Sequence, residues 1–261
     1  MTTWQQIKRL FSQDVSSETA QSVSLTVQKI SQAGEHIRRI TLGGAAIRKL
    51  PALHSGSHIQ LLFDKQGNPV TDSVTSQDDV IERPFTVRFC DPQMLLLTID
   101  IVTWPGRSYG PARRWAQTVQ LGQSIHIKGP WPGPRLAAEA DEVLLAGEAD
   151  AIPAIAHHLE TLNPASHGTV ILHCPGMNEN IVFSKPPNIQ IIWVNQTDSN
   201  LLAALQQYAP AGGSPAIWLG ARPDDIDTLK AWIAQTYLSA PHYIQVTAYT
   251  GDEDPVNSLT A

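Results

Sequence analysis

Apolar and polar residues alternate along the first half of the chain, which is the pattern of half-buried β-strands. Turn-forming residues separate the alternating stretches, as at Gly43-Gly44 and between Asp64 and Pro69. The predicted strands are residues 22–29, 36–42, 58–63, 85–89, 94–101 and 124–128. Six short strands with little helix between them predict a closed or nearly closed antiparallel barrel of the Greek-key type, with the polar residues 71–80 as a loop.

The pattern changes in the second half, where apolar runs alternate with helix-like stretches. A buried strand at residues 142–147 precedes a helix at 150–162, with Asp150 as its N-cap and Pro153 in its first turn. Further strands at 169–174, 189–194, 216–221 and 243–249 alternate with helices at 199–208 and 224–238. Such alternation predicts an α/β domain with a mostly parallel sheet.

These patterns divide the 261 residues into four parts. An N-terminal helix or extension covers residues 1–20, and the barrel domain covers residues 21–136. The α/β domain covers residues 137–250, and an acidic tail covers residues 251–261. The first residues resemble a short amphipathic helix rather than a secretion signal.

Composition narrows the possible partners and location. The net charge of −6 argues against nucleic-acid binding, and no apolar run approaches the roughly 18 residues of a membrane span. Two cysteines, Cys90 and Cys174, make no disulfide framework. We therefore expect a cytoplasmic protein, most simply a monomer, with no membrane insertion.

Charge is unevenly spread, because residues 105–138 contain no Asp or Glu. The cations in that span are Arg107, Arg113, Arg114, Lys128 and Arg135. A locally basic stretch in an acidic protein suggests a discrete anionic ligand. A solvated basic face is an equal alternative from charge alone.

The segment from Arg83 to Arg88 combines a predicted strand with side chains that the strand does not need. Pro84 cannot donate a ladder hydrogen bond, which places it at a strand start or edge and Arg83 at a rim. A guanidinium matches phosphate oxygens, Phe85 offers a flat surface to a ring, and Thr86 offers a hydroxyl. Phosphate, ring and hydroxyl contacts suit a flavin dinucleotide, although an arginine-containing strand is usually only a strand.

A second candidate site is the turn Gly110-Pro111-Ala112, which opens a predicted helix inside the acid-free span. Helix N-termini favour anions, and small residues let the backbone approach a pyrophosphate. The neighbouring Tyr109 and Trp115 are candidates for contact or for packing, and packing is favoured for Trp115.

A third candidate is the loop Gly147-Glu148-Ala149-Asp150, between a predicted strand and helix. It lacks the GxGxxG fingerprint, and its two carboxylates disfavour a phosphate directly against them. A ring or a ribose is therefore the expected ligand there. The chain has no CxxC pair, and the adjacent His157 and His158 point different ways on a helix, so no metal site is expected.

The three segments, in this order and spacing, resemble the siderophore-interacting proteins, which are flavin-dependent ferric-siderophore reductases of the ferredoxin–NADP reductase superfamily. Residues 83–88 match the family motif Arg-x-Tyr-Thr-x-Arg, with Phe85 for Tyr. Residues 110–116 match Gly-Pro-Ala-Ser-x-Trp-Ala, with Arg113 for Ser. Residues 146–155 match Ala-Gly-Asp-Glu-Thr-Ala-Leu-Pro-Ala-Ile, and the family's C-terminal Gly-Tyr-Trp-Arg segment keeps only Tyr249.

The resemblance implies a reductase that binds FAD in the barrel domain and passes electrons to a chelated ferric ion, with NAD(P)H or a ferredoxin as donor. Arg83 and the turn Gly110–Ala112 would hold the pyrophosphate, and Phe85 and Thr86 would contact the flavin ring. The other implied cofactor contacts are Val87, Val102, Tyr109, Trp115, Gly147, Glu148 and Asp150. Lys128 and Arg135 would attract the anionic ferric siderophore, and no protein group is expected to act as a general acid or base.

Two other functions remain open. One is an FAD-dependent NAD(P)H oxidoreductase with a protein or small organic acceptor. The other is a binding module that sequesters an anionic chelate without any redox chemistry.

Overall fold

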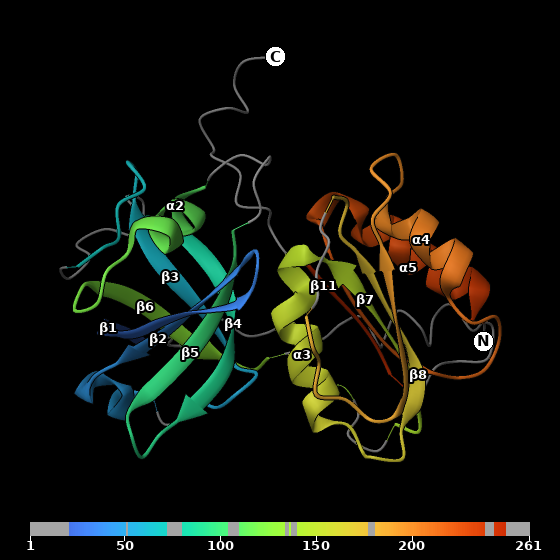
Figure 1. Cartoon of the computed structure of the whole chain (residues 1–261), viewed down its shortest axis with the longest axis horizontal. Helices are drawn as coiled ribbons and strands as arrows, with labels where there is room; N and C mark the ends of the chain where they lie inside the picture. Colours follow the sequence, from blue (N-terminus) through green and yellow to red (C-terminus); the bar gives the residue numbers. More distant parts are fainter. Residues whose placement is uncertain are drawn as a thin grey trace, which may run out of the picture. The chain divides into compact units, whose positions relative to one another are not determined.

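The structure, a computed structural model, describes residues 21–50, 52–71, 80–103, 110–133, 136, 140–176, 181–237 and 243–248. These residues form two compact units, one ending at Gly133 and one beyond it (Figure 1). The predicted terminal parts, residues 1–20 and 251–261, lie outside the described residues. Within the described part of the chain, no helix has the length and apolarity to cross a bilayer.

The first unit is a closed barrel of six antiparallel strands in the order β1-β2-β5-β4-β3-β6, which confirms the predicted class. The strands are β1 (Gln21–Gly34), β2 (Ile37–Gly43), β3 (His58–Asp64), β4 (Val80–Asp91), β5 (Leu96–Val102) and β6 (Ser124–Trp131). A short 3₁₀ helix, η1 (Ala45–Lys49), follows β2, and helix α2 (Pro111–Thr118) connects β5 to β6.

The period-two pattern accounts for the barrel core. Each strand presents alternate apolar side chains to the interior, and Leu25, Ile40, Ile59, Leu97 and Ile127 are at most 1% exposed. Side chains from α2 pack against the same core. The intervening positions on each strand therefore face away from the barrel interior.

Strand β4 is longer than the predicted strand at residues 85–89. It begins at Val80, opposite Asp64 of β3, and Pro84 lies within it opposite Gln60. The N–H of Val87 bonds Ser57 on the β3 side, so by alternation the nitrogen of Pro84 faces away from β3. Pairing of β4 with β5 begins only at Val87, so no ladder bond is lost at Pro84. Pro84 is therefore an edge residue, which is one of the two predicted alternatives, and it does not start the strand.

The second unit is a five-stranded parallel sheet in the order β11-β10-β7-β8-β9, which confirms the predicted α/β domain. Its strands are β7 (Glu142–Glu148), β8 (His167–His173), β9 (Asn188–Val194), β10 (Ala216–Ala221) and β11 (Ile244–Ala248). Helix α3 (Ile152–Thr161) covers one face, and α4 (Leu201–Tyr208) and α5 (Ile226–Thr236) cover the other (Figure 1). The 3₁₀ helices η3 (Ala149–Ala151) and η4 (Pro223–Asp225) precede α3 and α5.

The predicted start of α3 was wrong. Asp150 is not its N-cap, because the 3₁₀ turn η3 occupies that position and the capping residue of α3 is Ala151, with no side-chain cap bond. Pro153 does lie in the first turn, as predicted. Helix α4 has the side-chain cap that α3 lacks, since the carboxamide oxygen of Asn200 accepts a 2.9 Å hydrogen bond from the Ala203 N–H.

Candidate functional site

The outer face of β3 and β4 carries three polar side-chain atoms that are buried without a hydrogen-bond partner. They are Nε2 of His58, Oε1 of Gln60 and Oγ1 of Thr86. His58 lies directly opposite Thr86, and Gln60 lies opposite Pro84 two residues along. An unsatisfied buried polar atom costs about 1–3 kcal/mol, so three on one face indicate a surface built to receive a ligand with its own hydrogen-bonding groups.

Arg83 and Phe85 lie on the opposite side of β4 from Thr86. Their partners across the ladder, Leu61 and Ile59, are fully buried core residues, and Phe85 packs against the core. The Arg83 side chain is half-buried, and its Nη1 donates to the backbone oxygen of Glu82 at 3.2 Å. The predicted cofactor contacts of this segment therefore lie on both faces of β4, with Arg83 and Phe85 on one face and Thr86 on the other.

Arg88 stacks on a neighbouring aromatic ring near the C-terminal end of β4. It is 6% exposed, and its guanidinium carbon lies 4.3 Å from the ring centroid of Phe89. The guanidinium carbon of Arg39 lies 5.1 Å from the same ring and is held by a bidentate 2.7 Å pair with Asp100. This stacking accounts for an arginine at position 88 without a ligand.

His58 should make stability depend on pH. Burial lowers its pKa from 6.5 to about 4, so the native state resists the proton that the unfolded chain binds below pH 6.5. The free energy of unfolding should therefore fall by about 2 kcal/mol between pH 8 and pH 5 on account of this residue. Urea unfolding of the flavin-free protein at a series of pH values measures the decline.

Two variants check the assignment to His58. His58→Gln should remove this part of the decline, whereas His54→Gln, at an exposed position four residues earlier, should leave it in place. An unchanged pH dependence in His58→Gln would show that another group is responsible.

Helix α2 begins as predicted. Gly110 is its N-cap in an extended conformation, Pro111 is its first residue, and its first turn contains no acidic side chain. The first helical bond in this turn runs from the Arg114 N–H to the Gly110 oxygen at 3.1 Å, so the N–H groups of Ala112 and Arg113 precede the hydrogen-bond ladder of the helix. Their dipoles favour a negatively charged group such as a phosphate.

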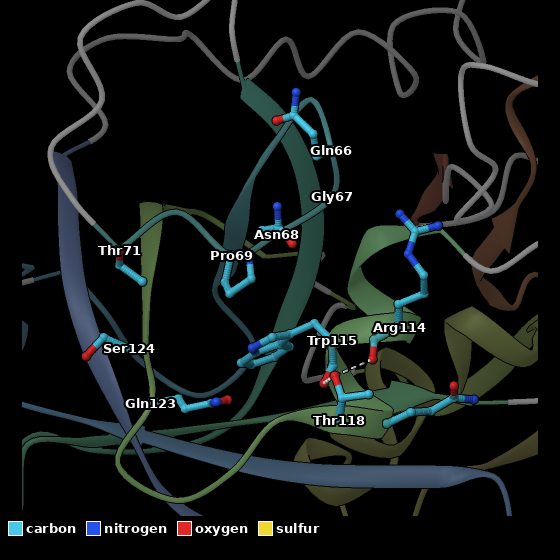
Figure 2. A pocket seen from close by; sticks show the side chains of 11 residues that line it. Gln66, Gly67, Asn68, Pro69, Thr71, Arg114, Trp115, Thr118, Gln123 and Ser124 are labelled. Atoms are coloured by element: carbon cyan, nitrogen blue, oxygen red, sulfur yellow. Dashed lines mark hydrogen bonds between the residues drawn. The ribbon is translucent and has the colours of Figure 1, made fainter.

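Trp115 packs in the barrel core. It is 4% exposed, and its ring meets that of Phe63 edge-on at a centroid distance of 6.3 Å. Figure 2 shows its indole at the side of a cavity of about 860 Å³. The cavity is lined by α2, by residues 66–69 and 71, and by residues 123–124, and no described lining residue carries a carboxylate. Trp115 therefore packs in the core and also borders this cavity, and its buried Nε1 has no described partner.

Three other predicted contacts of the first unit lie in strands β4, β5 and β6. Val87 is fully buried, and its backbone N–H and oxygen bond Ser57 and Gly56, so neither its side chain nor its backbone is available. Val102 ends β5 and is buried. Nζ of Lys128 lies 2.9 Å from Oε1 of Glu82, beside the outer face of β3 and β4. Tyr109 and Arg135 lie outside the described residues.

The second unit places Gly147, Glu148 and Asp150 at the carboxyl end of β7. A side chain at Gly147 would put its Cβ 2.5 Å from the Cβ of Ala151 and 3.0 Å from the oxygen of Gly220. Glycine is therefore needed there for packing of the sheet against η3. Asp150 lies in η3, at the end of β7 where open parallel sheets bind their ligands.

Glu148 lies between a histidine and an arginine at this edge. Its carboxylate oxygens lie 3.9 Å from Nδ1 of His173 and 3.9 Å from Nε of Arg222. The Ser199 hydroxyl donates to the Gln196 oxygen at 3.1 Å, so Nε2 of His173, 3.1 Å from the same hydroxyl, must donate to it. Sequence patterns missed His173, Ser199 and Arg222, which lie far apart along the chain.

Comparison with known proteins places both units. Residues 26–133 match the siderophore-interacting FAD-binding domain, and residues 140–249 match the siderophore-interacting protein domain. The two matches together cover most of the chain. The chain belongs to the siderophore-interacting protein family.

Relatives within the family are moderately similar. An uncharacterized protein of Mycobacterium tuberculosis is 31% identical over 171 residues, which are 61% of this chain and 60% of that protein, so the match spans less than two thirds of its length. Ferric vibriobactin reductase ViuB of Vibrio cholerae is 27% identical over 195 residues, 70% of this chain and 71% of that protein. The crystal structure of a siderophore utilization protein from T. fusca has a TM-score of 0.74 at 27% identity, covering 88% of this chain and 93% of that one.

The described residues fit FAD, the cofactor that the matched family domain binds. The unpartnered atoms of His58, Gln60 and Thr86 supply hydrogen-bonding groups for a heterocyclic ring, and all three lie within the matched range. The acid-free N-terminus of α2 supplies the positive field that a pyrophosphate needs.

Proposed function

We propose that the chain is an FAD-dependent reductase of ferric siderophores that reduces chelated Fe³⁺ to Fe²⁺ and so loosens the iron inside the cell. The observation that carries this is the set of three unpartnered polar atoms on β3 and β4, within a range that matches the siderophore-interacting FAD-binding domain. Similarity to a protein named ferric vibriobactin reductase supports the choice of acceptor.

In this proposal the barrel holds the cofactor through three groups of residues. Arg83 binds the pyrophosphate through its guanidinium, and the turn at Gly110, Pro111 and Ala112 binds it through backbone N–H groups at the start of α2. Thr86, His58 and Gln60 hydrogen-bond the ring, and Phe85 adds apolar surface at the strand. When bound, a flavin accepts two electrons together and releases them singly, as reduction of two Fe³⁺ ions requires.

The electron donor in this proposal is a reduced nicotinamide coenzyme at the carboxyl edge of the second sheet. Strands β7, β8 and β9 run in order to one side, and the chain then returns to place β10 and β11 on the other. The switch point between β7 and β10 is where open parallel sheets bind dinucleotides. Glu148 and Asp150 lie there, and a ferredoxin is the alternative donor.

The substrate is held electrostatically in this proposal, by Lys128 and Arg135. The ion pair with Glu82 partly offsets the charge of Lys128, so the attraction of Lys128 for an anionic substrate is weakened. Because exposed charges are screened by salt, the rate with an anionic ferric chelate should fall as salt is added, and the rate with a neutral chelate should not. Equal salt dependence for both chelates would exclude steering.

Trapping of ferrous iron tests the proposed reaction. The FAD-loaded protein is reduced without air by dithionite and freed of remaining dithionite by gel filtration, and a ferric siderophore is then added with a ferrous chelator. We expect about two ferrous ions per flavin, since each Fe³⁺ accepts one electron. Flavin-free protein taken through the same dithionite and gel-filtration steps, as the control, should yield none. Reoxidation by a quinone or a ferredoxin, with no ferrous ion from several siderophores, would instead favour a different acceptor.

A further inference from the structure

Charge is divided sharply between the two halves of the chain. Residues 140–249 contain ten Asp and Glu but only three Lys and Arg, which are Lys185, Arg222 and Lys230. Residues 1–139 contain eleven Asp and Glu and fifteen Lys and Arg. The half that holds the proposed coenzyme site is therefore acidic, with a net charge of −7 over residues 140–249. Any anionic coenzyme that binds there is opposed by this field.

The three cations of this half offer little to a phosphate at the carboxyl edge of the sheet. Nζ of Lys185 donates to the backbone oxygens of Ile189 at 2.6 Å and Pro186 at 3.4 Å. These bonds hold it at the amino end of β9, the opposite edge from the proposed site. Lys230 is part of helix α5.

Arg222 directly follows β10 at the switch point, but it already faces carboxylates. Its Nε lies 3.2 Å from Oδ2 of Asp225 and 3.9 Å from Oε2 of Glu148. Glu148, more than any other group, raises the pKa of Arg222. Its charge is thus offset by two carboxylates before any ligand arrives.

One carboxylate also lies next to the position where such folds recognise the ribose of a dinucleotide. That position is the end of the second strand, where an acidic residue bonds the 2′-hydroxyl or an arginine receives a 2′-phosphate. Here the second strand, β8, ends at His173, which bonds Ser199. Asp198 precedes Ser199 and is exposed, and every residue between His173 and Asp198 except Lys185 lacks a cationic side chain.

We infer that the nicotinamide coenzyme of this protein is the one without a 2′-phosphate, NADH, and that the acidic edge rejects NADPH. The inference rests on the proposed function, in which a nicotinamide coenzyme reduces the flavin. A 2′-phosphate adds a charge of about −2, and the edge offers it Asp198 and Glu148 instead of an uncommitted arginine. The uncharged 2′-hydroxyl of NADH can donate a hydrogen bond to these carboxylates without charge repulsion.

Coenzyme kinetics test the inference on the FAD-loaded protein, with ferricyanide as a general electron acceptor. We expect kcat/KM to be at least about tenfold higher with NADH than with NADPH, the effect of one unfavourable charge contact. The preference should narrow as salt is added, because screening weakens the repulsion. Equal values, or a preference for NADPH, would overturn the inference.

A matched pair of variants locates the effect. Asp198→Lys makes a two-unit charge change beside Ser199, at the proposed ribose position, and should narrow the NADH preference at least about threefold. Asp141→Lys makes the same change at an exposed residue just before β7, at the other edge of the sheet, and should leave the preference unaltered. If both variants, or neither, change the preference, local recognition at Asp198 is wrong.

The outcome also separates this inference from the proposed function. If neither coenzyme reduces the bound flavin while the dithionite-reduced protein still yields ferrous iron, the coenzyme inference is wrong and the ferric reductase proposal stands. If NADH reduces the flavin at least about tenfold more efficiently than NADPH but no ferric siderophore reoxidises it, the coenzyme inference stands and the proposed acceptor is wrong.

Discussion

Arg83→Ala is expected to weaken FAD binding by about 1.5–3 kcal/mol, or roughly 10- to 150-fold in Kd. The reason is that a guanidinium supplies charge-assisted hydrogen bonds to phosphate oxygens, and alanine supplies none. Arg83→Lys should lose less, because it keeps the charge while giving up the planar fork. Flavin-fluorescence titration of the flavin-free proteins measures the affinities.

Arg48→Ala is the matched control for this prediction. Arg48 lies at the end of η1 in the same unit and is exposed, so its removal should leave FAD affinity within experimental error. If Arg83→Ala binds FAD as tightly as the control, Arg83 does not hold the pyrophosphate. The α2 N-terminus would then be the remaining candidate for that role.

Trp115→Ala is expected to lower the free energy of unfolding by about 3–5 kcal/mol, the usual cost of removing a buried tryptophan. The side chain is 4% exposed and packs with Phe63 in the barrel core, so its loss leaves a cavity. Urea unfolding of the flavin-free protein measures this cost without any contribution from the cofactor.

Trp115→Phe separates packing from cofactor contact. It retains an aromatic ring in the core and should cost clearly less than Trp115→Ala. If Trp115 contacts the cofactor and does not contribute to packing, both variants should unfold like the wild type, and both should lose FAD affinity.

Much of the fold is predictable from local pattern. Alternation places Leu25, Ile40 and Ile59 inside a barrel, and continuous apolar runs such as residues 143–147 identify the buried parallel strands. The start of α2 is equally local, because Gly110 and Pro111 together define a helix N-terminus. Each of these predictions depends on residues within a few positions of one another.

The candidate site is less predictable, because its members meet only through strand register. Thr86 stands out in its own segment, but nothing near His58 or Gln60 in the sequence links them to it. The pairing of β3 with β4 brings these residues together across more than twenty positions. The cluster of Glu148, His173 and Arg222 depends in the same way on the order of strands in the sheet.

One local prediction failed because tertiary structure outweighed a local rule. Asp150 was expected to cap α3, and a 3₁₀ turn at the end of β7 displaced it. Pro84 was expected to start or edge a strand, and it is an edge residue, because its missing N–H faces an unpaired side of β4. Both residues lie in segments that the proposed function assigns to cofactor binding.

The barrel is proposed above all to bind a flavin dinucleotide through both its ring and its pyrophosphate. Titration of the flavin-free protein with FAD and with FMN, followed by visible absorbance, tests this directly. We expect bound FAD with a flavin spectrum and an affinity at least about tenfold greater than for FMN, which lacks the pyrophosphate contacts. Failure to retain FAD after reconstitution, or equal affinity for FMN, would contradict the claim.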